Sequence, residues 1–161
     1  MTTFEQLAEA RRAEILGYLM RLLGDPHDAE DACQEALLRA YRAFAHLPAE
    51  ANTRAWLYKI ATNTAFNVLK RRKRERERSV DMDLDRLASE AGVDQRDDLR
   101  AVAHAVEALP PKQRAALMQR QFQGLSYAEI AGALGCSETS ARANVHQALK
   151  KLREALKDEE K

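Results

Sequence analysis

The segment from Gly124 to Arg153 carries two helix-start signals with a turn glycine, Gly135, between them. Ser126 precedes an apolar run and Glu129 follows three residues later, which is the reciprocal capping pattern of a helix N-terminus. Gly135 then supplies the permissive backbone that a sharp turn requires, and Ser137 is placed to cap a second helix. The segment therefore predicts two helices joined by a tight turn, that is, a helix-turn-helix.

The second of these helices is predicted to have an apolar and a polar face. The apolar stripe, expected to pack on the first helix, contains Ala141, Val145, Ala148, Leu149 and Leu152. The opposite face carries small, hydrogen-bonding and cationic groups, namely Thr139, Ser140, Arg142, Ala143, Asn144, His146, Gln147 and Lys150. Such groups read base edges and hold phosphates in duplex DNA. A merely solvated face is the alternative, but the coincident capping box, turn glycine and small residues favour DNA contact.

The composition predicts an all-α chain without an enzymatic site. Six glycines and four prolines in 161 residues are few for a β-rich protein. No apolar run approaches a membrane span and the N-terminus lacks a secretion signal, so we expect a cytoplasmic protein that is not embedded in a membrane. Cys33 and Cys136 are expected to be reduced thiols. Metal-binding spacings, phosphate loops and nucleophile motifs are missing from the sequence, so we expect no metal, no cofactor, no small-molecule substrate and no catalysis.

The charge pattern divides the chain into three parts. The formal net charge is +1, but residues 1–80 carry 14 basic against 11 acidic groups, residues 81–98 carry 2 against 7, and residues 99–161 carry 10 against 7. The acidic middle favours an extended or partly helical connector. We therefore predict two small helical domains, 1–78 and 99–161, joined by an acidic linker, 79–98. The linker is either a solubilising spacer or a negative strand that lies in a positive channel of a partner.

Two further helices in the first part have distinct faces. One, from Asp28 to Phe44, places Asp28, Asp31 and Glu35 on a stripe that can dock a basic protein surface or simply face water. The other, from Arg54 to Lys70, buries Leu57, Ala61 and their helical neighbours. Its other face carries groups suited to melted DNA, where bases stack on rings and lysines hold phosphate: Trp56, Lys59, Asn63, Phe66, Asn67 and Lys70. Each ring could instead fill the core.

The run KRRKRERER, from Lys70 to Arg78, holds seven basic residues in nine. A localisation signal or a solvated helix end would have the same composition. Because the run continues the polar face of the preceding helix, we interpret it as a phosphate-neutralising strip.

These blocks together resemble one protein family. GDPHDAEDACQEALLRAYRAF, TRAWLYKIATNTAFNVLKRR, LPPKQRAAL, GLSYAEIAGALGCS and HQALKKLR occur in the order and spacing of a bacterial extracytoplasmic-function sigma factor, a small sigma subunit of RNA polymerase. The resemblance covers nearly the whole chain apart from the linker and the last residues. It implies a promoter-specificity subunit that joins core polymerase and nucleates promoter melting.

The resemblance implies three binding surfaces. The polymerase clamp would meet Asp28, Asp31, Gln34 and Glu35. The melted minus-ten element would meet Arg54, Trp56, Lys59, Asn63, Phe66, Asn67, Lys70 and Arg71, with base contacts at Asn63 and Asn67 and a flipped base held by loop 46–53. The minus-thirty-five duplex would meet the polar face of the second helix together with Tyr127, while the same domain sits on the polymerase flap. The linker would thread the polymerase channels, and an anti-sigma factor would be a further partner.

Two features depart from the family pattern. The recognition helix has Asn144 and Gln147 where many relatives repeat arginine, which predicts weak, salt-sensitive DNA binding by the isolated C-terminal domain. Gln119, Gln121 and Gln123 make the 112–123 helix more polar than the family pattern leads us to expect.

A free-standing helix-turn-helix regulator that acts without polymerase is the alternative function, and a protein-interaction module that keeps only the sigma shape is a third. A free-standing regulator would need a dimer interface or a sensor domain, but the tail 150–161 is too short and too charged for a convincing coiled coil. The intact basic and aromatic faces argue against the interaction module.

Overall fold

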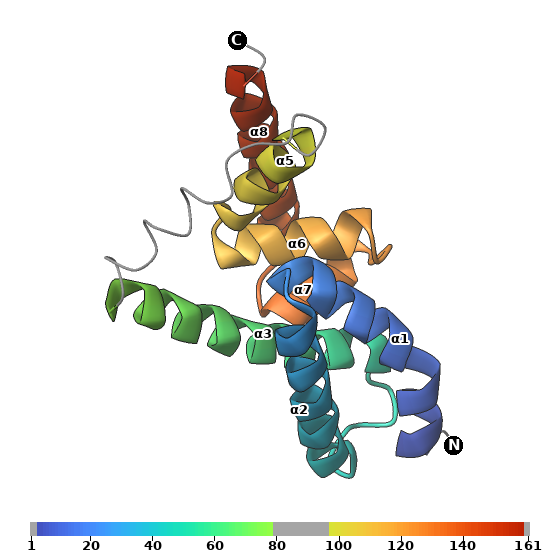
Figure 1. Cartoon of the computed structure of the whole chain (residues 1–161). Coiled ribbons are helices and arrows are strands. Elements are labelled where there is room, and N and C mark those ends of the chain that lie inside the picture. The colour runs from blue at the N-terminus through green and yellow to red at the C-terminus, as the bar shows by residue number, and fades with distance from the viewer. Residues whose placement is uncertain (1–2, 79–96, 160–161) are drawn as a thin grey trace.

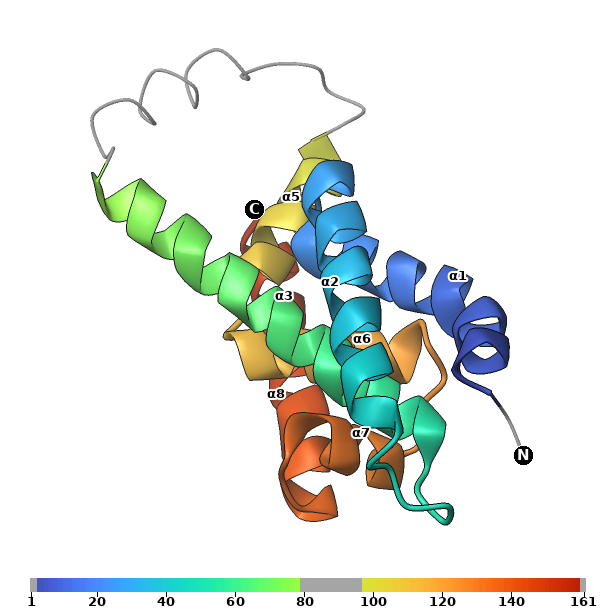
Figure 2. The ribbon, with the colours of Figure 1, turned by 90° about the horizontal axis from the view of Figure 1, so that it is seen from below.

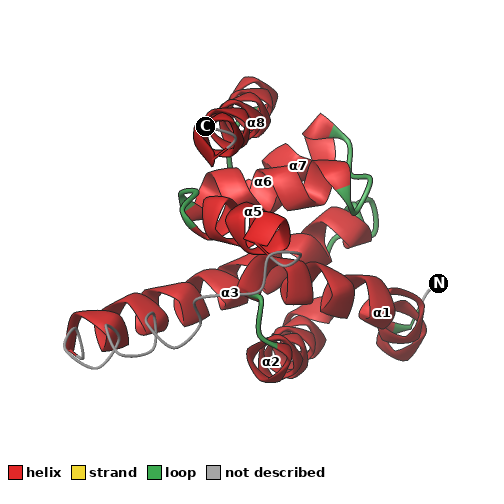
Figure 3. Ribbon diagram, turned by 45° about the horizontal axis from the view of Figure 1, so that its top comes forward, coloured by secondary structure: helices red, strands yellow, loops and turns green. Residues whose placement is uncertain are grey.

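The computed structural model describes residues 3–78 and 97–159, and within these ranges it contains helices and no strand (Figure 3). The N-terminal half consists of α1 (Phe4–Leu23), α2 (Pro26–Phe44) and α3 (Thr53–Arg78). The C-terminal half consists of α5 (Asp97–Glu107), α6 (Pro111–Gln121), α7 (Tyr127–Leu134) and α8 (Glu138–Glu159). The all-α prediction is confirmed, and most of the predicted acidic linker lies outside the described residues. None of the described helices combines the length and apolar character that crossing a membrane requires.

Local capping signals set the helix boundaries in the N-terminal half. Thr3 and Gln6 form a reciprocal capping box at the start of α1. Gly24 ends α1 with a left-handed φ of 73°, and Asp25 caps α2 ahead of Pro26. The chain thus reverses between α1 and α2 within two residues, so the two helices pack side by side.

The three N-terminal helices bury one apolar face each. Leu19 and Leu22 of α1 are at most 1% exposed, and they pack with the buried alanines of α2. On α3, the predicted inward residues Leu57 and Ala61 are buried, while the C-terminal turns extend beyond the other helices (Figures 1 and 2). Most side chains at the projecting end of α3 are therefore exposed to solvent, where their charges remain hydrated.

The predicted helix-turn-helix is confirmed in the C-terminal half. Ser126 and Glu129 exchange hydrogen bonds of 3.1 Å with each other's backbone N–H at the start of α7. Gly135 ends α7 with a left-handed φ of 66°, and the Ser137 hydroxyl accepts a hydrogen bond from the Ser140 N–H at the start of α8. The predicted apolar stripe of α8 faces α6 and α7, with Ala141, Val145 and Ala148 buried and Leu149 and Leu152 half-buried.

The two halves pack directly on each other, with α7 against α3 and α6 against α1 (Figures 1 and 3). Their apolar side chains form one continuous cluster, in which Met118, Leu125 and Ile130 of the C-terminal half meet the N-terminal core. The polar character of the 112–123 helix is explained by this contact. Gln119 is fully buried and bonds to Tyr18 and Thr62 across the boundary, so it serves the packing between halves.

Two glycines in the helix-turn-helix give opposite predictions. Gly135→Ala places a side chain at positive φ with nothing within 4 Å, so we expect backbone strain alone to lower the free energy of unfolding by about 1–2 kcal/mol. Gly132→Ala lies inside α7, where the new Cβ would sit 3.8 Å from Ala55 Cβ, and should raise stability by up to about 1 kcal/mol. Denaturant unfolding measures both, and equal losses for the two variants would contradict this account.

Candidate nucleic-acid interface

The outward face of α3 carries polar side chains along its central turns. Lys59, Asn63, Asn67 and Lys70 are all exposed, one turn apart along the helix. This spacing presents amides between cations, an arrangement that can bond base edges while the cations hold the neighbouring phosphates.

The two aromatic side chains of the predicted α3 surface are half-buried. Trp56 and Phe66 both pack against the apolar cluster, and the Trp56 ring centroid lies 6.3 Å from that of Phe44. Each residue therefore contributes to the core and is still partly exposed to solvent. The sequence left open whether each ring stacks on bases or packs in the core, and in the structure both rings pack against the core.

Arg54, at the start of α3, is already engaged within the chain. Its guanidinium donates to Glu14 Oε2 at 3.1 Å and to the Gln123 carbonyl at 2.6 Å, and it lies 5.8 Å from the centroid of the Tyr58 ring. In this arrangement Arg54 cannot also hold a phosphate with the same donors. The sequence could not indicate this because both partners are distant along the chain.

The basic run at the end of α3 splits into one structural and six surface residues. Arg72 turns inward and donates to the Leu23 carbonyl at 2.7 Å and to the Asp28 carboxylate. The other cations are exposed: Lys70, Arg71, Lys73, Arg74, Arg76 and Arg78. Arg71, Arg74 and Arg78 line a polar hollow of about 310 Å³ beside Asn67. A phosphate backbone that follows α3 past Asn67 would thus meet cations on successive turns.

The polar face of α8 points away from the rest of the helix-turn-helix. Seven of its eight predicted contact residues are exposed, and the eighth, Asn144, is half-buried and donates to the Ser140 carbonyl at 3.0 Å. The Gln147 side chain accepts a hydrogen bond from Gln113 at 2.9 Å, so it is oriented by α6. The face is therefore a continuous surface of small and polar groups on a rigid helix, as insertion into a major groove requires.

Tyr127 is placed beside this face rather than on it. Two guanidiniums contact its half-buried ring, with Arg120 at 4.2 Å and Arg142 at 4.9 Å from the ring centroid. The ring thereby orients Arg142 at the edge of the α8 face.

The acidic stripe of α2 is less uniform than its sequence suggested. Asp31, Gln34 and Glu35 are exposed, and Glu35 pairs with Arg39 one turn later at 2.7 Å. Asp28 is instead half-buried and accepts from Arg72, so it ties the start of α2 to α3. Asp28 therefore has an internal role that the stripe pattern did not reveal.

Sequence reasoning missed two exposed apolar residues on α2. Leu38 is 57% exposed and Tyr41 is 62% exposed, and both follow Gln34 on neighbouring turns. Phe4 of α1 contacts the Tyr41 ring at a centroid distance of 5.4 Å. Exposure on an otherwise amphipathic helix was not visible in the sequence, because the spacing of these residues fits an extended apolar face equally well.

The described residues contain no cluster of three or more His, Cys, Asp or Glu side chains that could hold a metal ion. Cys33 is buried, Cys136 is half-buried, and both are free thiols. Burial raises the pKa of the Cys33 thiol, although the nearby Arg12 cation opposes this shift.

Both halves match models of one protein family. Residues 7–75 match "Sigma-70 region 2" and residues 99–152 match "Sigma-70, region 4". The chain is 32% identical to the RNA polymerase sigma-H factor of Pseudomonas aeruginosa, over 95% of this chain and 86% of that protein. It is 30% identical to the ECF RNA polymerase sigma factor SigE of Mycolicibacterium smegmatis, over 97% of this chain and 62% of that longer protein.

Solved structures share the fold. The sigma factor RpoE of Bartonella quintana, crystallised with the anti-sigma factor NepR, superposes with a TM-score of 0.72 at 24% identity, covering 96% of both chains. CnrH, solved with the cytosolic domain of CnrY, gives a TM-score of 0.71 at 23% identity, covering 96% of this chain and 88% of CnrH.

The family models and the relatives in sequence together identify the family. The chain belongs to the sigma-70 family of RNA polymerase sigma factors, in the extracytoplasmic-function class, and the alternative of a free-standing regulator is disfavoured.

Asp28 and Asp31 provide a matched pair for testing the two roles of the α2 acids. Asp28→Ala removes the acceptor of Arg72, so we expect the free energy of unfolding to fall by about 1–3 kcal/mol. Asp31→Ala changes an exposed residue and should stay within about 0.5 kcal/mol of the original chain. Denaturant unfolding compares them, and a negligible effect of Asp28→Ala would show that the Arg72 contact does not stabilise this packing.

Proposed function

We propose that this sigma factor recruits core RNA polymerase to promoters by dividing recognition between its two halves. Residues 1–78 form the unit that binds the polymerase clamp and the minus-ten element, and residues 99–161 form the unit that binds the minus-thirty-five element and the flap, with the acidic linker 79–98 between them. The observation that carries the proposal is the exposed amide and lysine face of α3, which occurs on the same chain as a helix-turn-helix with an exposed polar face.

The α3 face supports capture of a melted strand. Asn63 and Asn67 are exposed one turn apart, with Lys59 and Lys70 on either side. Amide side chains bond base edges that duplex pairing conceals, so they bind the open strand better than the closed duplex. Such differential binding shifts the promoter toward the melted state without any covalent step by the protein. The basic end of α3 then holds the phosphates of the adjacent DNA.

The α8 face supports binding to intact duplex. Its contact residues are small or polar, and only Arg142 and Lys150 among them carry a permanent positive charge. Few phosphate contacts imply modest affinity that falls with salt. The C-terminal half would therefore depend on polymerase to hold it near the minus-thirty-five element.

Protein partners follow from the remaining surfaces. The exposed Asp31, Gln34 and Glu35 on α2 suit a basic surface, which we assign to the polymerase clamp. The structures of RpoE and CnrH were solved in complex with the anti-sigma factor NepR and with the cytosolic domain of CnrY, respectively, and we infer that a cognate anti-sigma factor also binds this chain. The protein would act in the cytoplasm and carry out no catalysis of its own.

Run-off transcription with purified core polymerase, on promoter fragments from the source organism, tests this function. The original chain should start specific transcripts. Asn63→Ala/Asn67→Ala should reduce them about tenfold or more, because each base contact contributes about 1–3 kcal/mol of discrimination. Glu9→Ala, an exposed change on α1, should leave them unaltered.

Two results of that assay would count against the proposal. Full activity of the Asn63→Ala/Asn67→Ala variant would show that the α3 face does not read the promoter. If the protein did not bind core polymerase but still bound duplex DNA in a gel-shift assay, the free-standing regulator would become the better account.

A further inference from the structure

One glutamine of α6 occupies a position that helical spacing assigns to an apolar residue. Gln113 lies four residues after Leu109 and four residues before Leu117. Both leucines are 3% exposed and belong to an apolar cluster with Ala148 of α8. Gln113 is itself only 9% exposed. Because a buried amide gives up its hydration, its hydrogen bonds determine what it contributes at this position.

The Gln113 amide has a single hydrogen-bond partner among the described residues. Its Nε2 donates to Gln147 Oε1 of α8 at 2.9 Å, whereas its own Oε1 is buried and unpaired within that part of the chain. An apolar side chain of similar length would pack beside the leucines without leaving a buried acceptor unsatisfied, so stability alone does not account for the amide. The structural effect of the amide is to orient Gln147.

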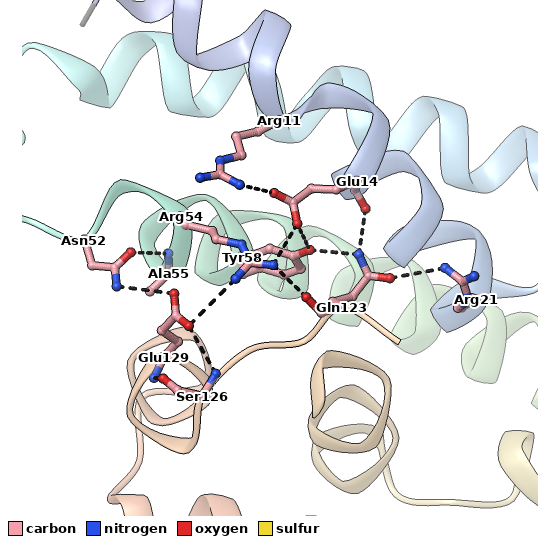
Figure 4. A network of polar contacts seen from close by, with 10 residues as sticks. All are labelled: Arg11, Glu14, Arg21, Asn52, Arg54, Ala55, Tyr58, Gln123, Ser126 and Glu129. Atoms are coloured by element: carbon pink, nitrogen blue, oxygen red, sulfur yellow. Dashed lines mark hydrogen bonds and ion pairs between the residues drawn. The ribbon is translucent and has the colours of Figure 1, made fainter. Parts of the chain in front are cut away.

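The other glutamines of segment 112–123 have different surroundings. Gln119 and Gln123 donate to tyrosine hydroxyls of the N-terminal half, and Figure 4 shows the second of these bonds. Gln121 is exposed. Gln113 is therefore the glutamine of this segment whose hydrogen bond reaches the polar face of α8.

The bond from Gln113 fixes which end of the Gln147 amide is available to a ligand. Gln147 is exposed on the polar face of α8, one turn from Ala143 and one turn from Lys150. Its Oε1 is turned toward α6 by Gln113. The end left for a ligand is Nε2, whose two N–H groups have no acceptor among the described residues. An unrestrained glutamine would offer either end.

An amide that offers only donors selects different bases from an unrestrained one. Bidentate reading of adenine requires the amide oxygen to accept from N6 while the amide N–H donates to N7. Guanine presents two acceptors, O6 and N7, so it requires donors alone. Gln147 held by Gln113 therefore suits guanine, whereas a released Gln147 suits adenine.

We propose that Gln113 is a positioning residue that determines promoter specificity through Gln147. It holds the Gln147 N–H groups toward the major groove and so makes α8 prefer guanine to adenine at one position of the minus-thirty-five duplex. Gln113 contacts no base itself, because it is buried between α6 and α8. The base preference rests on the promoter-binding function proposed above, whereas the orientation of Gln147 in the free protein does not.

Gln113→Met tests the role of the amide without opening a cavity. Methionine is similar in length to glutamine and suits the apolar neighbours Leu109 and Leu117, but it cannot donate to Gln147. The variant should therefore be at least as stable as the original chain in denaturant unfolding. A loss of stability with an unchanged base preference would show that the amide is purely structural.

The base preference is measured by transcription with core polymerase and the full chain. The templates derive from a promoter found in the run-off assay, with each base pair of the minus-thirty-five element replaced in turn. At one position the original chain should favour guanine over adenine, and Gln113→Met should lower this ratio about fivefold or more. Gln121→Met makes the same change at an exposed position of α6 and should leave the ratio unaltered.

Gln147→Ala completes a double-mutant cycle. This variant should lose the preference at the same position, and adding Gln113→Met to it should change nothing further. Preferences at the other positions should persist in Gln113→Met, since Asn144 on the same face is held by the Ser140 carbonyl instead. An effect of Gln113→Met that persists without Gln147, or a preference that survives Gln147→Ala, overturns the positioning role.

Nuclear magnetic resonance tests the orientation independently of transcription. In the free full chain the side-chain N–H groups of Gln147 should have a higher order parameter than those of the exposed Gln121. In Gln113→Met the Gln147 value should fall to that of Gln121. An unchanged Gln147 value overturns the restraint. If the original chain starts no transcripts, the sigma function fails instead, and the order parameters alone then decide whether Gln113 holds Gln147.

Discussion

The polar contacts of the Arg54 guanidinium are those on which the arrangement of the two halves depends most. It lies in the first turn of α3, donates hydrogen bonds to the Glu14 carboxylate of α1 and to the Gln123 carbonyl, and comes within 3.8 Å of the Glu129 carboxylate on α7. Because a guanidinium offers five donors in a fixed plane, one side chain can satisfy groups from several helices. Arg54, in the first turn of the proposed promoter-reading helix, thus also links the two halves of the chain.

Much of the fold could be predicted from the sequence because its signals are local. The capping pair Ser126 and Glu129, the turn glycine Gly135 and the apolar stripe of α8 all act within one or two helical turns, and the structure has each of them as expected. The faces of α3 followed from helical periodicity in the same way. The exposed positions of Asn63 and Asn67 needed no information beyond their spacing.

The remaining features depend on contacts between residues far apart in the sequence. Asp28 belongs to the acidic stripe by spacing, but Arg72, 44 residues later, determines that it is half-buried. Gln119 made its helix more polar than the family pattern predicts. In the structure it is buried and donates a hydrogen bond to Tyr18, 101 residues away. A polar residue that does not fit its own helix therefore indicated a contact with another part of the chain, without identifying which part.

The capture of a melted promoter strand by the exposed face of α3 is the central claim of this account. Binding of single-stranded promoter DNA by the complex of core polymerase with this chain tests it directly. We predict that Asn63→Ala/Asn67→Ala weakens this binding about tenfold or more, whereas Glu9→Ala leaves it unchanged. Equal binding by the original chain and both variants would contradict the claim.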